Sequence, residues 1–524
     1  MVTMSSINGR RAVLFMVPAV FIICAGLYGL MAYGGIRTAD GEVVFKAGEA
    51  LATTASLALT EDLAAWPGFA VARGVDGRMY SVFAPGQSIL LVPLIKLGIT
   101  VNRTGWYKTD KFHIPVSFTV DENSLRDYLL NRPPGQPEKH ALRFLVSLFM
   151  PFISALTVVI YFIIIRRLTG SIPAASATAF LLALATPLWS YSGTMFKEPL
   201  TLLWTMLAFY CLVSVNHRFG APGKRYIRLF LAGLFSGLGF FCHVTAVLFV
   251  PFFFFYAIIS SMNGRLDRPA LKKGLMGALI FIGGFSIFTG IFCWLNYARF
   301  GSIWETGRLI SPVIYGTMMP PWEGLAGLTI SPGKGLLWFC PAVLTGLVWW
   351  PRFHKAEPAL SFLLAGLIIF HWFFFSCRSD WHGGFCLGPR YLLPVIPFLL
   401  IPAAFCLSGR CGRKGSSGRW RARLLFIFFI ACIIQQVYFC LGEPISFYYL
   451  IKQHFLKAGI SIISDNSIYF QWRTSPLFFL LEANRGPFLL RQIPMNNYSL
   501  LVLVSVIISI PAGLAFLLRR RVRD

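Results

Sequence analysis

The stretch FLVSLFMPFISALTVVIYFIII, residues 144–165, decides the fold of this chain. It holds no charged side chain, and Arg166 and Arg167 follow it directly. An α-helix needs about 20 apolar residues in a row to cross the ~30 Å hydrocarbon core of a bilayer, and positive residues collect at the cytoplasmic ends of such helices. The stretch therefore predicts a membrane-spanning helix whose Arg166 end faces the cytoplasm.

Further apolar runs lie on both sides of this one. They cover residues 12–34, 172–190, 199–215, 229–241, 243–259, 274–295, 335–350, 359–376, 391–408, 424–441 and 499–518. Together with a composition of 56% hydrophobic and 13% charged residues, they predict an all-α integral membrane protein of about 12 transmembrane helices. The first run is expected to be a signal anchor and not a cleaved signal peptide. The runs at 229–241 and 243–259 are read as two helices, and one bent helix is the alternative.

The charged residues divide between the two sides of the predicted bundle. Of the 21 acidic residues, all but Asp267, Glu357 and Asp524 fall in one set of loops, and the other set is rich in Lys and Arg. By the positive-inside rule the basic loops and both termini face the cytoplasm. Topology and anionic lipid then explain the net charge of +26, so we expect no nucleic-acid binding. Chemistry that needs carboxylates belongs to the outer face.

Three outer segments are too long to be simple connectors, and long loops in compact proteins are usually functional. Residues 35–143 include amphipathic stretches, 47–59 and 89–97, that are expected to lie along the membrane interface. The others are 296–334 and 442–498; aromatic clusters in the latter, at 447–449 and 469–472, predict an interfacial belt. We expect a transmembrane domain of residues 1–410, and a C-terminal pair of spans with its outer loop in residues 411–524.

Asp40 is the first candidate for chemistry on the outer face. It lies a few residues beyond the first predicted span, so its carboxylate is expected at membrane-surface depth, where it can act as a general base for a hydroxyl. An ordinary solvated acid at a helix end is the alternative. Downstream, DGRMYS (76–81) predicts a tight turn. PGQS (85–88) predicts a helix start that can face an anion, with Arg78 adding charge.

Two short outer loops hold further candidates. In FKEPL (196–200), Lys197 and Glu198 precede a proline at the predicted first turn of a helix, where the carboxylate is either a cap or a functional acid at membrane depth. In 378–391, three glycines allow close approach of a ligand to the backbone, and Arg390 brings a guanidinium suited to phosphate. The remaining candidates are Glu42, Tyr80, His243, Arg308, Lys334, His382 and Tyr391.

Cysteine usage gives little further information. The 11 cysteines show neither a CxxC motif nor zinc-site spacing. Cys377 and Cys386 fall in one outer loop, and both a disulfide and two unpaired thiols fit that position.

Taken together, these segments resemble a known family. The matching pieces occur in the family's order and cover residues 10–410: Asp40, DGRMYS (76–81) with PGQS (85–88), FKEPL (196–200), NYARFGS (296–302), SPGKGL (331–336), and WHGG (381–384) with GPRYLLP (388–394). The pattern is similar to that of bacterial multi-span glycosyltransferases of the C superfamily (GT-C, family 39-like). Protein O-mannosyltransferases and the lipid A aminoarabinose transferase are relatives.

The resemblance implies an enzyme of the bacterial inner membrane with a periplasmic active site. It would transfer one sugar from a polyprenyl-phosphate donor to an acceptor hydroxyl of a lipid, glycan or protein, with inversion at the anomeric carbon. Asp40 would be the general base, and Glu198 would be a second catalytic residue. The donor phosphate would be bound by Arg390, Arg78, His382 and Lys334. A divalent metal ion between Asp40 and Glu198 is left open, and no other cofactor is expected.

The sequence departs from the family in two places and leaves other functions open. Many relatives carry an acidic pair after the first span, whereas this chain has Asp40 and Glu42; His243 stands where many have a basic residue and a proline. Alternative functions are a lipid-linked-sugar flippase or transporter, an O-antigen ligase- or polymerase-like enzyme, and a non-catalytic scaffold. The spans are nearly free of charged residues, which favours an enzyme over a flippase.

Overall fold

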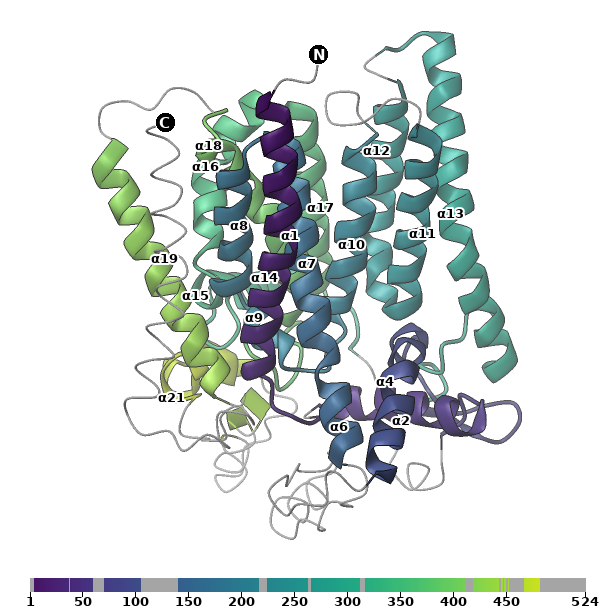
Figure 1. The fold of residues 1–524 in the computed structure, drawn as a ribbon. Coiled ribbons are helices and arrows are strands. Elements are labelled where there is room, and N and C mark those ends of the chain that lie inside the picture. Colours follow the sequence, from purple (N-terminus) through teal and green to yellow (C-terminus); the bar gives the residue numbers. More distant parts are fainter. Residues whose placement is uncertain are drawn as a thin grey trace.

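Figure 1 shows the computed structural model of the protein, a bundle of long helices with a layer of shorter elements across one end. The structure describes residues 4–36, 38–59, 70–104, 140–215, 224–262, 265–311, 316–410, 418–442, 444–445, 447–448, 451 and 466–480. The predicted last span, 499–518, and Tyr449 of the predicted aromatic belt lie outside these residues.

The bundle is built from long apolar helices. In chain order they are α1 (Met4–Leu30), α7 (Phe149–Thr169), α8 (Ile172–Leu184), α10 (Glu198–Val213), α11 (Arg225–Cys242), α12 (Val250–Met262), α13 (Arg268–Phe300), α16 (Val343–Ala356), α17 (Pro358–Ser376), α18 (Ile396–Leu407) and α19 (Gly418–Leu441). Within the described residues, seven helical segments are long and apolar enough to cross a membrane, and three more apolar helices are shorter. This confirms the predicted helical membrane fold.

The two runs at 229–241 and 243–259 form separate helices, as the sequence predicted. α11 ends at Cys242, and His243 adopts an extended backbone with φ −154° and ψ 115°. The chain then enters the 3-10 helix η2 (Val244–Phe249), which leads into α12. The alternative of one bent helix is therefore excluded, and His243 lies at the break between two spans.

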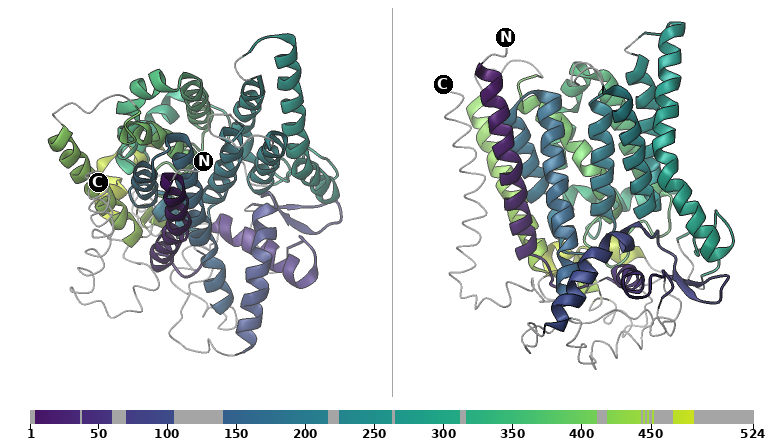
Figure 2. Two further views of the ribbon diagram at one scale, coloured as in Figure 1. Left: turned by 45° about the horizontal axis from the view of Figure 1, so that its top comes forward. Right: turned by 45° about the vertical axis from the view of Figure 1, so that its right-hand side comes forward.

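A layer of short elements, which we call the outer layer, covers the end of the bundle opposite the N-terminus (Figures 1 and 2). It contains α2 (Ala39–Thr54), the antiparallel strands β1 (Val71–Arg73) and β2 (Met79–Ser81), α4 (Gly86–Arg103) and α6 (His140–Ser147). The predicted amphipathic stretches fall largely in α2 and α4. The predicted tight turn joins the two strands, with Gly77 at φ +80°. The hydroxyl of Ser88 donates to the carbonyl of Val44, 2.9 Å away, and so ties α4 to α2.

Glycine allows the closest helix contacts in the bundle. A Cβ atom on Gly233 of α11 would lie 1.9 Å from the carbonyl oxygen of Phe281 in α13, and one on Gly284 would lie 2.1 Å from that of Phe230. Small residues at helix interfaces commonly allow membrane helices to approach closely. They fix α11 against α13 and so hold the His243 break beside the outer layer.

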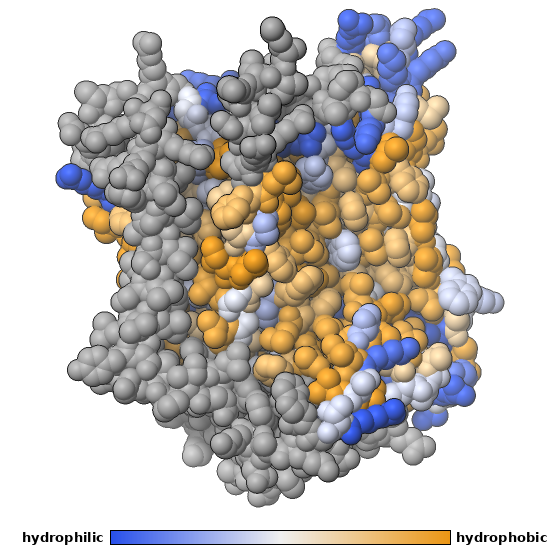
Figure 3. Space-filling model, viewed as in Figure 1, coloured by the Kyte–Doolittle hydropathy of each residue, from blue (hydrophilic) through white to orange (hydrophobic). Residues whose placement is uncertain are grey.

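Most charged residues of the described bundle helices lie near helix ends. In Figure 3, hydrophobic residues form a broad band across the visible face, and hydrophilic residues gather above it near the N-terminal end. Two of the three acids predicted to face the cytoplasm lie at helix starts: the carboxylate of Asp267 accepts from the N–H of Ala270 at 2.8 Å and caps α13, and Glu357 precedes α17. The described basic residues Arg166, Arg225 and Lys272 lie in end turns of their helices.

A buried ion pair joins two helices of the outer layer, α2 and α6. Arg143 of α6 donates two hydrogen bonds to the carboxylate of Glu42 in α2, at 2.6 and 2.7 Å, and both side chains are only 2% exposed. The Arg143 guanidinium also lies 4.9 Å from the ring centre of Phe45. Glu42 therefore has a local structural partner, and this pairing holds the helix that carries Asp40.

We predict that breaking this pair destabilises the fold. Removing one partner of a buried ion pair leaves the other charge uncompensated, which costs about 3–5 kcal/mol. Glu42→Gln and Arg143→Met are each expected to lower the melting temperature in detergent, measured by intrinsic fluorescence. The double variant is expected to be more stable than either single variant, since it leaves no lone charge. A double variant whose loss equals the sum of the two single losses would show that the residues act independently.

Candidate active site

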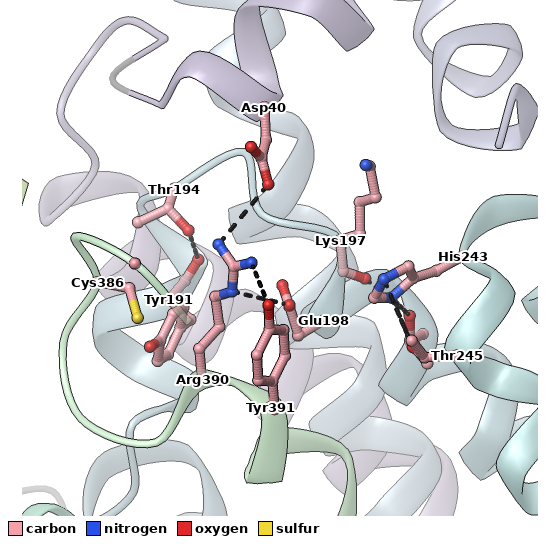
Figure 4. Close-up of polar contacts among 12 residues, drawn as sticks. Asp40, Tyr191, Thr194, Lys197, Glu198, His243, Thr245, Cys386, Arg390 and Tyr391 are labelled. Atoms are coloured by element: carbon pink, nitrogen blue, oxygen red, sulfur yellow. Dashed lines mark hydrogen bonds and ion pairs between the residues drawn. The ribbon is translucent and has the colours of Figure 1, made fainter. Parts of the chain in front are cut away.

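Arg390 lies between two carboxylates where three outer segments meet (Figure 4). Its Nη1 atom is 3.7 Å from Oδ2 of Asp40, and its Nε atom is 3.1 Å from Oε1 of Glu198. The Nε contact is an ion pair without the alignment of a hydrogen bond, because the Nε–H finds no aligned acceptor among the described residues. The sequence placed these three residues in separate motifs, and the structure brings them together.

Helix starts position all three charged groups. Asp40 is in the first turn of α2, where the Thr38 hydroxyl accepts from the N–H of Gly41 at 3.0 Å. Glu198 begins α10, and Arg390 begins the 3-10 helix η3 (Arg390–Val395) that leads into α18. Gly41 is required here, since a Cβ atom at this position would lie 2.5 Å from the Cβ of Met195. This close approach lets α2 carry Asp40 up to the loop before Glu198.

The three side chains differ in exposure. The Asp40 side chain is 25% exposed, that of Arg390 12%, and that of Glu198 4%. Oε2 of Glu198 is buried and has no hydrogen-bond partner among the described residues. Asp40 is thus the acid that a hydroxyl from outside can reach, and Glu198 is the acid that holds Arg390 from below.

Aromatic rings support the Arg390 guanidinium. It lies 4.3 Å from the ring centre of Phe196 and 5.0 Å from that of Tyr391. The Tyr391 ring is stacked on Phe375 of α17, with 4.4 Å between ring centres, and its hydroxyl accepts from Nη2 of Arg390 at 3.4 Å. Cation–π contacts of this kind strengthen when water is excluded. They restrict the guanidinium to the plane in which it meets both acids.

Lys197 adds a second cation beside the cluster. Its ammonium lies 3.0 Å from the ring centre of Phe83, and the residue is 6% exposed. Burial lowers the pKa of Lys197 to about 7, and Asp40 acts in the opposite direction. Arg308 also lowers the pKa of Lys197, which places its charge near the same group. Lys197 therefore changes its charge near neutral pH.

His243 lies next to Lys197 in Figure 4. Its Nδ1 atom is 3.1 Å from the hydroxyl of Thr201 in α10 and 3.1 Å from that of Thr245 in η2. These contacts tie the break between α11 and α12 to the helix that begins with Glu198. In this position His243 helps to hold α10, the helix that begins with Glu198.

His382 belongs to the WHGG loop and has a defined tautomer. Its Nδ1 atom accepts from the N–H of Gly384 at 2.9 Å, so the neutral ring carries its proton on Nε2. Burial, together with a smaller effect of nearby Lys334, lowers the pKa of His382 to about 3. The ring is stacked on Tyr469, with 4.7 Å between centres. At neutral pH His382 is a hydrogen-bond donor without charge.

The Lys334 side chain, from another segment, is completely buried against the same loop. Its ammonium donates to the carbonyl oxygens of Gly384 and Cys386, at 2.8 and 2.6 Å, and lies 3.4 Å from the Cys386 sulfur. A lysine has three donors, and these three contacts use all of them.

Arg78 and Tyr80 lie in the β1–β2 hairpin. Nε of Arg78 is 3.8 Å from a carboxylate oxygen of Asp76, and the Arg78 side chain is 68% exposed. The Tyr80 hydroxyl donates to Asp76 at 2.6 Å, and burial raises the pKa of Tyr80 to about 12. No contact with Arg390 is recorded for either residue in the described part of the chain. The hairpin is bound to α13 instead, through the N–H of Val75 and the carbonyl of Arg299.

The arrangement does not fit a divalent metal between Asp40 and Glu198. The Arg390 guanidinium occupies the position between the two acids. Among the residues that the structure describes, no three His, Cys, Asp or Glu side chains are grouped as metal ligands. Cys377 and Cys386 are both free thiols in this structure.

Comparison with known families now bears on this site. Residues 140–288 match the model of a family described as dolichyl-phosphate-mannose-protein mannosyltransferase. The predicted family resemblance is confirmed. The mannosyltransferase-like segment runs from α6 into α13 and includes Lys197, Glu198 and His243. It supports the coarser functional prediction, a membrane glycosyltransferase.

Several solved structures match most of this chain, each with a TM-score below 0.5. ArnT from Cupriavidus metallidurans in the apo state has 13% sequence identity and a TM-score of 0.49, covering 84% of this chain and 68% of that one. ArnT from the same organism, bound to undecaprenyl phosphate, has 15% sequence identity and a TM-score of 0.46, covering 80% of this chain and 63% of that one. The oligosaccharyltransferase of Archaeoglobus fulgidus in the apo form has 12% sequence identity and a TM-score of 0.43, covering 92% of this chain and 62% of that one. No curated protein matches the sequence.

Sequence reasoning missed the contribution of the C-terminal outer segment to this region. Tyr448 and Tyr469 are 1% and 3% exposed, so the prediction that they join an interfacial belt is wrong. They pack on the WHGG loop because their rings cover Lys334 and His382. Trp472 is 48% exposed, as a belt residue would be.

Proposed function

We propose that this protein is a membrane glycosyltransferase that moves one sugar from a polyprenyl-phosphate donor to an acceptor hydroxyl, with inversion at the anomeric carbon. The observation that carries the proposal is the contact of Arg390 with both Asp40 and Glu198 at the outer end of the bundle. The match to the mannosyltransferase family supports it. The acceptor is a lipid, a glycan or a protein.

Arg390 stabilises the phosphate leaving group in this proposal. The bond between the anomeric carbon and the phosphate oxygen breaks, and negative charge grows on the departing phosphate. A fixed cation at that point acts on the transition state more than on the substrate. Glu198 and the rings of Phe196 and Tyr391 hold Arg390 in place. The long 3.7 Å contact with Asp40 is the one that an incoming phosphate replaces.

Asp40 removes the proton of the acceptor hydroxyl. As the Arg390 contact passes to the phosphate, the Asp40 carboxylate becomes free to accept a hydrogen bond from the hydroxyl. The hydroxyl oxygen then attacks the anomeric carbon from the face opposite the phosphate, and its proton passes to Asp40. A single displacement of this kind inverts the anomeric centre. General-base catalysis of this type contributes about 10²–10⁴-fold to the rate.

The membrane supplies the donor's second binding surface. The site lies at the end of apolar helices, where a polyprenyl chain can stay in the bilayer while its phosphate reaches Arg390. ArnT, similar in fold, has been crystallised with undecaprenyl phosphate, which makes that lipid the first to test here. We place the site on the periplasmic face of a bacterial inner membrane, with both termini in the cytoplasm, because the basic helix ends lie at the opposite end.

We predict that use of the donor falls as pH rises through neutrality. In the free enzyme Lys197 is charged below its pKa of about 7 and neutral above it. If the ammonium attracts the donor phosphate, kcat/KM for the donor decreases about tenfold per pH unit above that value, since kcat/KM reports the free enzyme. A bound phosphate raises the lysine pKa, so kcat changes less.

Two variants test whether Lys197 causes this decrease of kcat/KM above pH 7, which we call the pH limb. Lys197→Arg keeps a positive charge across this pH range, so it is expected to stay active and to show no decrease of kcat/KM above pH 7. Lys197→Met removes the limb and lowers kcat/KM at pH 6. A limb that persists in both variants would assign the titration to another group.

The proposal is tested with donors of defined class. Purified protein in detergent is incubated with undecaprenyl monophosphate sugars and undecaprenyl diphosphate sugars carrying a labelled sugar, with crude membrane acceptor. Transfer from the monophosphate, with inverted configuration in the product, supports the proposal. Use of the diphosphate alone would indicate a ligase-like enzyme. In proteoliposomes, movement of either lipid without its consumption would indicate a flippase.

A further inference from the structure

The loop that carries Arg390 has little rigidity of its own. Gly383, Gly384 and Gly388 have φ values of +70°, +76° and +55°, a backbone region that other residues rarely adopt. The few backbone hydrogen bonds inside the loop include those from Cys386 to Gly384 and from Arg390 to Gly388, at 2.9 and 3.1 Å. A loop of this composition needs contacts from other segments to hold one conformation.

Lys334 supplies such contacts from the segment between α14 (Pro321–Ile330) and α15 (Leu336–Phe339). Its ammonium binds the carbonyls of Gly384 and Cys386 on either side of Phe385. The side chain is 0% exposed, and its donors are already used by the loop. This leaves no N–H group for a donor phosphate.

The C-terminal outer segment closes over the same ammonium. The Tyr448 and Tyr469 ring centres lie 4.6 and 5.1 Å from Nζ of Lys334. The Tyr448 hydroxyl donates to the carbonyl of Gly333 at 3.1 Å, and the N–H of Gly333 donates to the carbonyl of Tyr469 at 2.9 Å. The buried cation is thus balanced by carbonyl dipoles and two aromatic faces, which is a recognised way of stabilising a lysine.

We propose that Lys334 is a positioning residue: with Tyr448 and Tyr469 it clamps residues 383–390 so that Arg390 reaches Asp40 and Glu198. This inference rests on the proposed function for its effect on phosphate binding. It also gives the C-terminal outer segment a defined role, since that segment provides both aromatic faces of the clamp. A residue that bound phosphate directly would keep a donor for it, and Lys334 has none left.

The first test is a double-variant cycle for binding of undecaprenyl phosphate in detergent micelles. Arg390→Met and Lys334→Met are expected to weaken binding by about 100-fold and 10-fold, in line with the loss of charged hydrogen bonds. The double variant is expected to bind no more weakly than Arg390→Met alone, because Lys334 acts through Arg390. Losses that multiply would show that Lys334 contacts the phosphate itself and would overturn the proposal.

The second test does not depend on the proposed function. Cys386 is 1% exposed and touches Lys334, so its reaction with a membrane-impermeant maleimide, followed by peptide mass spectrometry, reports whether the loop has opened. Lys334→Met and Tyr469→Leu are expected to speed labelling at least about tenfold, whereas Tyr469→Phe keeps the ring and stays near wild type. Unchanged labelling in Lys334→Met would refute the clamp. If wild type binds no undecaprenyl phosphate, the function fails, and the labelling still decides the clamp.

Discussion

Replacing Arg390 with methionine is expected to lower the rate of sugar release from the donor by about 10²–10³-fold, the loss seen when one preorganised donor to a developing anion is removed, or about 3–4 kcal/mol. The reason is that Arg390 is the cation that the structure places between Asp40 and Glu198. Single-turnover release of a labelled sugar from undecaprenyl phosphate measures the effect. Most of the loss is expected in kcat, because the charge on the phosphate grows as the bond breaks.

Stability is the main complication of this experiment. The single Arg390 variant leaves Glu198, 4% exposed, without its cation. The double variant Arg390→Met with Glu198→Gln removes both charges and is expected to recover thermal stability without recovering activity. Arg390→Lys keeps the charge but loses the planar contact with two partners, so we expect intermediate activity. A stable double variant with wild-type turnover would remove Arg390 from the mechanism.

Replacing Asp40 with asparagine is expected to reduce turnover by about 10²–10⁴-fold with little change in stability. Asparagine keeps the size of the side chain and cannot take a proton. Because the Asp40 side chain is 25% exposed and its Arg390 contact is 3.7 Å long, little folding energy depends on its charge. Donor binding is expected to persist or improve, since one negative group near the phosphate is removed.

A matched control uses another acid of the outer layer. The Asp76 carboxylate accepts the Tyr80 hydroxyl at 2.6 Å in the β1–β2 hairpin, and Asp76→Asn is expected to leave turnover within about twofold of wild type, as surface substitutions usually do. If Asp40→Asn turns over as fast as Asp76→Asn, the base is another residue. Glu198 is then the next acid to test, because its second oxygen has no hydrogen-bond partner in the described part of the chain.

Much of the fold follows from local properties that sequence patterns report. Apolar runs predicted the helical membrane fold, and seven described helical segments are long and apolar enough to span a membrane. The break at His243 was less certain from sequence, because residues 229–259 are largely apolar and contain no Asp, Glu, Lys or Arg. It is fixed by long-range packing, in which Gly233 and Gly284 bring α11 and α13 together.

The site was predictable as a set of residues and not as a geometry. Asp40, Glu198 and Arg390 stand out because charges are rare at membrane depth. Their mutual contact depends on three helix starts that are far apart in the chain, which no local pattern reports. The family resemblance also included Lys334, a weaker candidate than Arg390, among the residues that would bind the donor phosphate. Only the structure shows that Lys334 uses its donors on the backbone of the Arg390 loop.

The most direct test of the account is single-turnover formation of undecaprenyl phosphate from a labelled undecaprenyl-phosphate sugar, compared between wild type and the Arg390→Met, Glu198→Gln double variant. The account predicts that wild type forms undecaprenyl phosphate in step with glycosylated acceptor. The folded double variant forms less than about 1% as much in the same time, as expected when the main stabiliser of the leaving group is lost. Equal formation by the two proteins would contradict a transfer site centred on Arg390.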